Sequence, residues 1–312
     1  MLTTYIIKRL MMLVPTVFGI LLVTFLIQAF IPTDVVAQMY LGTQAESQSA
    51  EAMANMRAKF HLDKPWYIQF AYYFQNVIKG DLGISVKTRE PVSSLIGYRY
   101  INTIKLTFAS LIIAVIIGVG TGILSAYYKD TVWDIVGMGV GLFGLSMPAF
   151  FFGIILLFLF AVKLRWFPVV GFGDWRHLIL PAFNLGIIES ASLSRVTRAS
   201  MLEVLNQDYI RTSRAKGLHE NIVVFKHVLR NALLPVVTNI GLQIGGLLGG
   251  AFIIEVVFAW HGIGELAVKA IGWRDFSITQ GIIIISAITY VMVNLLVDLL
   301  YRFIDPRVRL SD

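Results

Sequence analysis

Long apolar stretches with few charges are the feature that most constrains how this chain can fold. They cover residues 10–31, 103–128, 133–162, 178–194, 236–258 and 279–301. A helix of about 20 apolar residues crosses the roughly 30 Å hydrocarbon core of a bilayer. In lipid the backbone must satisfy its own hydrogen bonds, which a helix does within one segment. The stretches therefore predict an all-α polytopic membrane protein with six transmembrane helices in a lipid bilayer.

The composition agrees with this class. Of the 312 residues, 57% are hydrophobic and 14% are charged, whereas soluble proteins carry about 25% charged residues. The net charge of +7 need not indicate nucleic-acid binding, because Lys and Arg gather in the cytoplasmic loops of membrane proteins. No nucleic-acid partner is expected. The chain has no cysteine, which excludes disulfides, thiol catalysis and Cys-ligated metals.

Charge placement predicts the orientation. Lys8 and Arg9 precede the first apolar stretch, and basic flanks of this kind stay in the cytoplasm. That stretch is too long for the apolar region of a cleavable signal peptide, so we expect it to be retained. Six spans then return the C-terminus to the cytoplasm as well.

Three parts are expected along the chain. They are an N-terminal transmembrane helix at 1–31, an external (periplasmic or extracellular) helical segment at 32–101, and a core transmembrane domain at 102–312. In the external segment, residues 45–60 are expected to be helical, and Asp63-Lys64-Pro65 signals a further helix start with the proline just inside it. An aromatic stripe follows, which predicts either a helix at the membrane interface or one packed on the protein's own spans. The stripe consists of Trp66, Phe70, Tyr73, Phe74 and Val77.

The longest polar interruption of the C-terminal half runs from Asp208 to Pro235. We expect Asp208 to cap a helix that runs to Lys216, and Gly217 to take the left-handed position that ends it. A second helix is then predicted by an apolar stripe at helical spacing. Its members are Phe225, Val228, Leu229 and Ala232. This elbow is either a plain basic loop or a docking element.

Two prolines, Pro148 and Pro181, interrupt apolar stretches, and broken membrane helices often line a cavity. Glu189 is ionisable within a predicted span, which makes it a functional candidate. It either faces a pathway or lies close enough to the inner surface to be hydrated. The candidate pathway residues are Glu189, Asn184, Pro148 and Ser146.

Several chemistries are absent from the sequence. There is no phosphate-binding G-x-x-x-x-G-K-[ST], no H-E-x-x-H zinc motif and no G-x-S-x-G nucleophile elbow. The chain is therefore not expected to bind ATP by a P-loop, hold a metal or act as an enzyme. Energy for any active process must come from elsewhere.

The stretch SMLEVLNQDYIRTSRAKGL at Ser200–Leu218 resembles the cytoplasmic coupling loop of bacterial ABC importer permeases. The resemblance is to the branch that imports dipeptides, oligopeptides, nickel and glutathione, and it extends over nearly the whole chain. The general motif begins Glu-Ala-Ala, but Arg211-Thr212-Ser213 stands there in this chain. Further matching segments are GDLGIS at Gly80–Ser85, SMPAFFFG at Ser146–Gly153, EVVFAWHGIG at Glu255–Gly264 and DPRVR at Asp305–Arg309.

The resemblance implies a type I ABC importer permease in the bacterial cytoplasmic (inner) membrane. Its implied partners are a second homologous permease, two cytoplasmic ABC ATPases and an external substrate-binding protein. This chain would bind no cofactor, since ATP and Mg would be used by the ATPases. The coupling loop would occupy about 198–235. Its implied contacts with an ATPase are Asp208, Tyr209, Arg211, Thr212, Ser213, Arg214, Ala215, Lys216, Gly217 and Leu218.

The function that the resemblance implies is import of short peptides by alternating access, driven by ATPases docked on the elbow. A nickel-chelate or glutathione importer is the alternative within the same class. An ATP-independent secondary transporter or channel is the alternative from another class. It would call for inverted repeats or several paired intramembrane charges, and the sequence shows neither.

Overall fold

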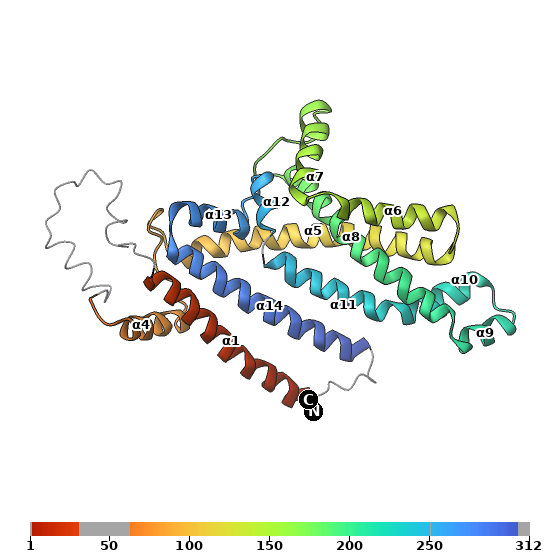
Figure 1. Ribbon diagram of the computed structural model, residues 1–312, viewed down its shortest axis with the longest axis horizontal. Helices are drawn as coiled ribbons and strands as arrows, with labels where there is room; N and C mark the ends of the chain where they lie inside the picture. The colour runs from red at the N-terminus through yellow and green to blue at the C-terminus, as the bar shows by residue number, and fades with distance from the viewer. Residues whose placement is uncertain (1, 31–62, 250, 305–312) are drawn as a thin grey trace. The chain divides into compact units, whose positions relative to one another are not determined.

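The computed structural model describes residues 2–30, 63–249 and 251–304 (Figure 1). Within these ranges the chain is helical with short loops and has no named β-strand, which confirms the all-α prediction. The predicted helix at 45–60 lies outside the described residues. The elements are α1 (Leu2–Phe30), α4 (Trp66–Ile78), α5 (Val92–Tyr127), α6 (Val132–Ser146), α7 (Ala149–Leu156), η1 (Leu157–Lys163), α8 (Trp175–Leu205), α9 (Asp208–Ala215), α10 (Glu220–Ile222), η2 (Val223–Val228), α11 (Leu229–Leu248), α12 (Phe252–Val257), α13 (Ile263–Trp273) and α14 (Phe276–Ile304).

The chain divides into two compact units. The first combines Met1–Tyr100 with Leu266–Ile288, and the second combines Ile101–Glu265 with Thr289–Asp312. Three described helices are long and apolar enough to cross a membrane, namely Val92–Tyr127, Glu220–Leu248 and Phe276–Leu299. Met11–Ile27 and Ala149–Lys163 are shorter apolar helices. The full count of six spans therefore stays a prediction.

In the first unit, α4 packs on α1 through aromatic rings. Phe18 of α1 lies edge-on to Phe70 and Phe74, with ring centroids 5.6 and 5.5 Å apart. Phe25 contacts Phe70 and Tyr73 at 5.4 and 5.9 Å. Of the two interpretations of the aromatic stripe, the structure supports packing on the protein's own helix. The helix starts at Trp66 and not before Pro65, since Pro65 is the residue that precedes it.

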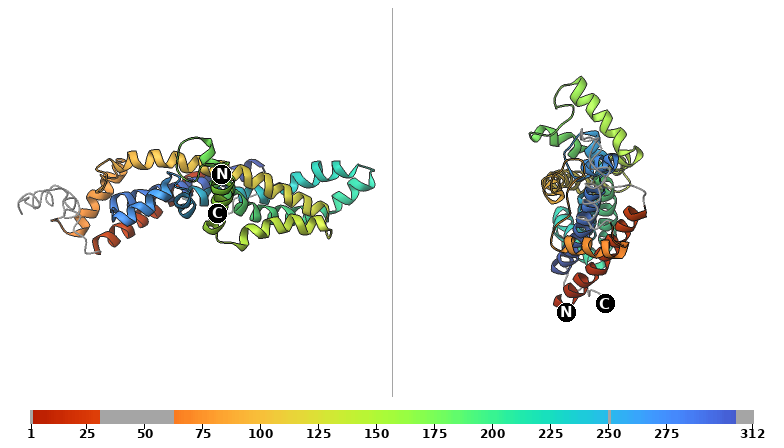
Figure 2. Two further views of the ribbon diagram at one scale, coloured as in Figure 1. Left: turned by 90° about the horizontal axis from the view of Figure 1, so that it is seen from above. Right: turned by 90° about the vertical axis from the view of Figure 1, so that its left-hand side faces the viewer.

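The second unit is organised around α8, which packs against both α6 and α11 (Figures 1 and 2). Glycines let α5 approach α8 closely. A Cβ atom added to Gly118 would lie 2.7 Å from the Ser190 carbonyl oxygen, and one added to Gly122 would lie 2.6 Å from the Thr197 Cβ. These glycines therefore serve helix packing within the chain.

The predicted span 133–162 is not one helix. Helix α6 ends at Ser146, Met147 is extended (φ −118°, ψ 145°), and Pro148 precedes α7. Proline disfavours helical backbone in the residue before it, which explains the break. Figure 1 shows α7 turned away from the axis of α6.

Pro181 behaves differently, and the expectation that it breaks the chain's fourth apolar stretch is wrong. It lies inside α8, which continues from Trp175 to Leu205. Pro181 is buried, so packing by neighbouring groups offsets the lost hydrogen bond. The predicted span 236–258 is also not one helix. Helix α11 starts earlier, at Leu229, and ends at Leu248, and the separate helix α12 starts at Phe252.

Candidate functional site

The polar elbow folds as a short helix, a glycine turn and a second helix, as predicted. Helix α9 is closed by the Gly217 N–H donating to the Arg214 carbonyl at 2.9 Å and the Leu218 N–H donating to the Ser213 carbonyl at 3.4 Å. This pair of hydrogen bonds requires a left-handed residue after the helix. Gly217 supplies it with φ +75°. The direction in which the chain continues from α9 into α10 therefore depends on glycine at this position.

The expectation that the Asp208 side chain caps α9 is wrong. Gln207 precedes the helix, no side chain caps it, and Asp208 is the first helical residue. The Asp208 carboxylate lies 3.6 Å from the Arg211 guanidinium, and both side chains are strongly exposed. Its place in the first turn still favours the helix, because a negative charge there interacts favourably with the helix dipole.

An ion pair joins the two halves of the elbow. The Arg214 Nε and Nη2 atoms donate to Glu220 Oε2 and Oε1 at 3.1 and 2.6 Å. The hydrogen bond to Glu220 holds the pKa of Arg214 above its usual value. Both side chains are about 44% exposed, so the pair contributes roughly 1 kcal/mol or less. Arg214 therefore braces the elbow internally, in addition to any contact outside it.

Ile210 fixes the elbow to the helix bundle. Its side chain is fully buried in a cluster supplied by four elements of the second unit. The other buried members are Ala126 of α5, Met201 of α8, Val223, Val224 and Val228 of η2, and Ala232 of α11. Displacement of α9 must therefore carry the ends of these helices with it, because packed interiors deform little.

Replacing Ile210 with alanine is expected to destabilise this junction by about 3 kcal/mol, through lost burial and the cavity left behind. Hydrogen exchange of the α9 amides should accelerate more than that of α14. Arg211→Ala is the matched control, since the Arg211 side chain is 74% exposed and its removal should leave exchange unchanged. Equal exchange in Ile210→Ala and the parent protein would contradict this role.

The outer surface of the elbow mixes apolar and basic groups. Tyr209, Leu218, Ile222 and Phe225 are 43%, 37%, 45% and 58% exposed. A Cβ atom on Gly217 would meet nothing within 4 Å. The prediction that Phe225 belongs to the inner stripe is wrong, because η2 is a π-helical turn. Its wider turn rotates Val224 inward instead.

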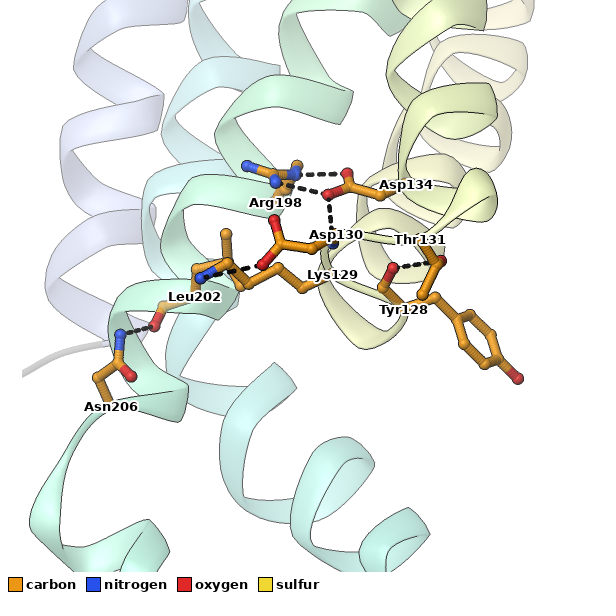
Figure 3. Close-up of polar contacts among 8 residues, drawn as sticks. All are labelled: Tyr128, Lys129, Asp130, Thr131, Asp134, Arg198, Leu202 and Asn206. Carbon is orange, nitrogen blue, oxygen red and sulfur yellow. Dashed lines mark hydrogen bonds and ion pairs between the residues drawn. The ribbon is translucent and has the colours of Figure 1, made fainter.

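Helix α8 leads into the elbow, and its elbow-proximal end is locked to α6 (Figure 3). Arg198 Nε and Nη2 donate to Asp134 Oδ1 and Oδ2 at 2.8 and 2.7 Å. The Asp130 N–H donates to Asp134 Oδ2 at 3.1 Å, and Ser125 Oγ donates to the Asp134 carbonyl at 3.0 Å. The Asp134 side chain is 9% exposed. Two-point pairing of this kind fixes both orientation and distance.

Sequence reasoning missed this lock. Asp134 and Arg198 are separated by 64 residues, and each stands alone near the edge of an apolar stretch. The single available signal was an acidic residue in the first turn of a membrane helix. Only the packing of α6 on α8 reveals its partner.

Glu255 lies near the end of a predicted span, and its role also depends on contacts that the sequence does not show. Its carboxylate is fully buried. It accepts hydrogen bonds from Thr103 Oγ1 at 2.8 Å and from the Gly264 and Glu265 N–H groups at 2.7 and 3.0 Å. A side chain on Gly262 would collide with it. Glu255 therefore holds the EVVFAWHGIG segment against α5 and the start of α13.

Three of the four candidate pathway residues gather at the break between α6 and α7. Ser146 ends α6, Pro148 precedes α7, and Asn184 Nδ2 donates to the Ala149 carbonyl at 3.1 Å. Asn184 is fully buried, so it braces the break from within the protein. Glu189 lies further along α8 and is partly exposed. No group of three or more metal-ligating side chains occurs in the described part of the chain.

The arrangement defines an all-helical membrane subunit with a protruding, glycine-ended elbow, and comparisons with known proteins agree. Residues 118–310 match the family model described as "Binding-protein-dependent transport system inner membrane component". Residues 1–107 match its N-terminal counterpart, "Binding-prot-dependent transport system membrane comp, N-term". The chain belongs to this family of ABC importer permeases, which are multi-pass proteins of the inner membrane.

Curated relatives cover almost the whole chain. It is 42% identical over 305 residues to "Glutathione transport system permease protein GsiC" of Escherichia coli (strain K12), with 98% of each chain covered. The same protein of Shigella dysenteriae serotype 1 matches with the same identity and coverage.

Solved structures support the fold alone. A chain of the inward-facing MetNI methionine ABC transporter aligns with a TM-score of 0.56 and 17% identity, covering 67% of this chain and 96% of that one. A chain of an amino acid ABC transporter with histidines aligns with a TM-score of 0.55 and 16% identity, covering 68% of this chain and 94% of that one.

Proposed function

We propose that this permease subunit imports short peptides by alternating access, and that glutathione is the first peptide to test. Glutathione is itself a short peptide, and the name of the GsiC relatives assigns them its transport. A nickel-chelate importer is the alternative. The assembled importer contains a second homologous permease, two cytoplasmic ABC ATPases that use ATP and Mg, and an external substrate-binding protein. Both termini of this chain lie in the cytoplasm.

The observation that carries the mechanism is the construction of the elbow. Its inner face is anchored by the buried Ile210, and its outer face presents exposed groups around a glycine with open space beside it. Such a surface suits insertion into a groove on an ATPase. When the two ATPases close on ATP, each carries its elbow with it. The anchored helices follow and switch the pathway from inward-open to outward-open.

The contact residues on this chain are those of α9 and the turn after it. Arg211 and Lys216 are exposed and suit acidic groups at the rim of a groove. Leu218 and Tyr209 supply apolar surface. Arg211, Thr212 and Ser213 replace the acidic start of the general motif, so the contact made there by other importers must be made differently here.

The docking can be tested with single cysteines, because the chain has none of its own. In Leu218→Cys, maleimide labelling of the permease pair in detergent is expected to slow at least about tenfold when the ATPases are added. Trp166→Cys is the control, since Trp166 is 62% exposed and lies in the loop between η1 and α8, outside the elbow. Unchanged labelling of the Leu218→Cys variant with the full importer assembled would overturn the docking.

The substrate is tested on the binding protein, which selects what reaches the permease. Calorimetric titration of that purified protein with glutathione, a dipeptide and a nickel chelate ranks the three ligands. Uptake of the tightest-binding ligand by the reconstituted importer then tests the function. Binding of a nickel chelate alone would refute peptide import.

A further inference from the structure

In the first unit, the loop that precedes α5 is clamped onto the start of α14 by one buried carboxylate. Asp275 is 1% exposed, and its Oδ2 atom accepts hydrogen bonds from Ser85 Oγ at 2.7 Å and from the Lys87 N–H at 3.1 Å. Its Oδ1 atom accepts from the Ile278 N–H at 3.2 Å, as the side chain of a helix N-cap residue does. Asp275 therefore both begins α14 and fixes the loop to it.

The clamped loop is also closed on itself by hydrogen bonds. The Ser85 N–H donates to the Glu90 carbonyl at 2.9 Å, and the Arg89 N–H donates to the Ser85 carbonyl at 3.0 Å. Ser85 Oγ accepts from the Thr88 N–H at 2.9 Å. The loop therefore presents a fixed backbone, and a surface that is already ordered loses less entropy when a partner binds.

The surface that this clamp fixes is basic and carries an aromatic ring. Lys87, Arg89 and Arg274 are exposed, against the one exposed carboxylate of Glu90. Trp273 precedes Arg274 at the end of α13 and is 38% exposed. The Lys87 ammonium and the Arg274 guanidinium form no ion pair with any residue that the structure describes. We call these five residues the basic platform.

The backbone does not require the two arginines of the platform. Arg89 has φ +61° and Arg274 has φ +56°, and glycine adopts this left-handed conformation at lower cost than any other residue. Their side chains are therefore not needed to form the turns. Replacing one of them with glycine removes its charge without straining the fold.

A protein surface rich in carboxylates fits the platform better than a lipid headgroup does. Trp and Arg are among the residue types that contribute most to binding at protein interfaces. Segments that bind anionic lipids carry about four to eight Lys or Arg and lie on the cytoplasmic side. The platform has three such residues, and the topology predicted from the sequence places it outside the cell.

We propose that the basic platform docks an acidic surface of the external substrate-binding protein. This inference rests on the proposed function, which gives the importer such a protein and places residues 32–101 outside. Asp275 is a positioning residue here, because it holds the platform on the first turn of α14 and does not itself touch the partner.

The test measures the affinity of the purified binding protein for the assembled importer in nanodiscs. Combining Lys87→Glu with Arg274→Glu is expected to weaken binding at least about tenfold at low salt, because like charges then face each other. The difference should shrink at about 0.5 M salt, which screens exposed charges. Arg165→Glu is the matched control, since Arg165 is an exposed cation with φ +54° in the loop between η1 and α8; it should bind like the parent.

A second pair of variants separates the side chain from the fold. Arg274→Gly should weaken binding several-fold without lowering the thermal unfolding midpoint, whereas Arg274→Lys should keep most of the affinity. Parental affinity in the Lys87→Glu/Arg274→Glu variant would overturn the platform. So would an equal loss in Arg165→Glu, which would show attraction by the net charge alone.

Crosslinking identifies what covers the platform. Thr88 is exposed and the chain has no cysteine, so Thr88→Cys can carry a single benzophenone maleimide in nanodiscs that contain anionic lipid. Illumination with the purified binding protein should give an adduct of that protein's mass, and the same label on Lys226→Cys in the elbow should not. An adduct with lipid alone would overturn the proposal.

Failure of the platform is distinguishable from failure of the proposed importer. If the Lys87→Glu/Arg274→Glu variant binds and imports like the parent, the platform is refuted and import stands. If the purified binding protein does not bind the parent importer at either salt concentration, the proposed assembly fails and the platform fails with it.

Discussion

Replacing Gly217 with valine is expected to abolish uptake. The residue has φ +75°, a conformation that costs a β-branched residue more than the roughly 1–2 kcal/mol typical of L-residues. The hydrogen bond from the Leu218 N–H to the Ser213 carbonyl, which ends α9, would then be lost. The exposed apolar side chains of the elbow would no longer be held in their positions. Uptake by the reconstituted importer should fall to background, whereas the binding protein should keep its affinity for the substrate.

Gly217→Asn is the matched variant, because asparagine enters the left-handed region with little strain. Open space beside the glycine accommodates its side chain within this chain. If only the turn matters, Gly217→Asn should transport at a rate close to that of the parent. If an ATPase must approach the bare backbone, both variants fail. Normal uptake by Gly217→Val would refute the lever mechanism itself.

Breaking the lock between α6 and α8 is expected to have the second large effect. Arg198→Met leaves the Asp134 carboxylate, whose side chain is 9% exposed, without its cation. Removing one partner of such a buried pair costs about 3 kcal/mol. The thermal unfolding midpoint should fall. ATP hydrolysis should become uncoupled from uptake, because movement of the elbow and α8 is no longer transmitted to α6.

A double-mutant cycle separates pairing from charge. Combining Arg198→Met with Asp134→Leu removes both charges and leaves apolar groups of similar bulk, an exchange that is often neutral. Most of the lost stability should return, with a coupling energy of about 2 kcal/mol between the two positions. Strictly additive losses would show that Arg198 and Asp134 act independently. Recovery of stability without recovery of coupled transport would show that the charges themselves take part in transmission.

The elbow could be predicted from sequence because its determinants are local. A glycine after a short polar helix specifies a left-handed residue, since φ > 0 is open to glycine at little cost. Gly217 was therefore placed correctly. The apolar stripe of the second elbow helix is predicted less accurately. Val228 and Ala232 are buried as predicted, but the π-helical turn rotates Phe225 outward, and helical spacing assumes a regular α-helix.

Proline positions show the same limit. Pro148 breaks the chain and Pro181 does not, although both interrupt apolar stretches. The difference lies in packing around each site, which spacing does not report. The aromatic stripe of α4 likewise left two interpretations open until contacts between its rings and those of Phe18 and Phe25 decided between them.

By itself the sequence determined the class of this protein: an all-helical membrane chain that carries a glycine-ended polar elbow and lacks any nucleotide-binding motif. These properties follow from composition and local backbone preference, which neighbouring residues specify. Only the tertiary structure decided that Arg198 pairs with Asp134, that Glu255 is a buried acceptor of three hydrogen bonds, and that Gln243 of α11 donates to the Glu189 backbone carbonyl of α8. Each of these contacts depends on which helices pack together. The spacing of residues along the sequence reports local structure and does not show which distant residues meet.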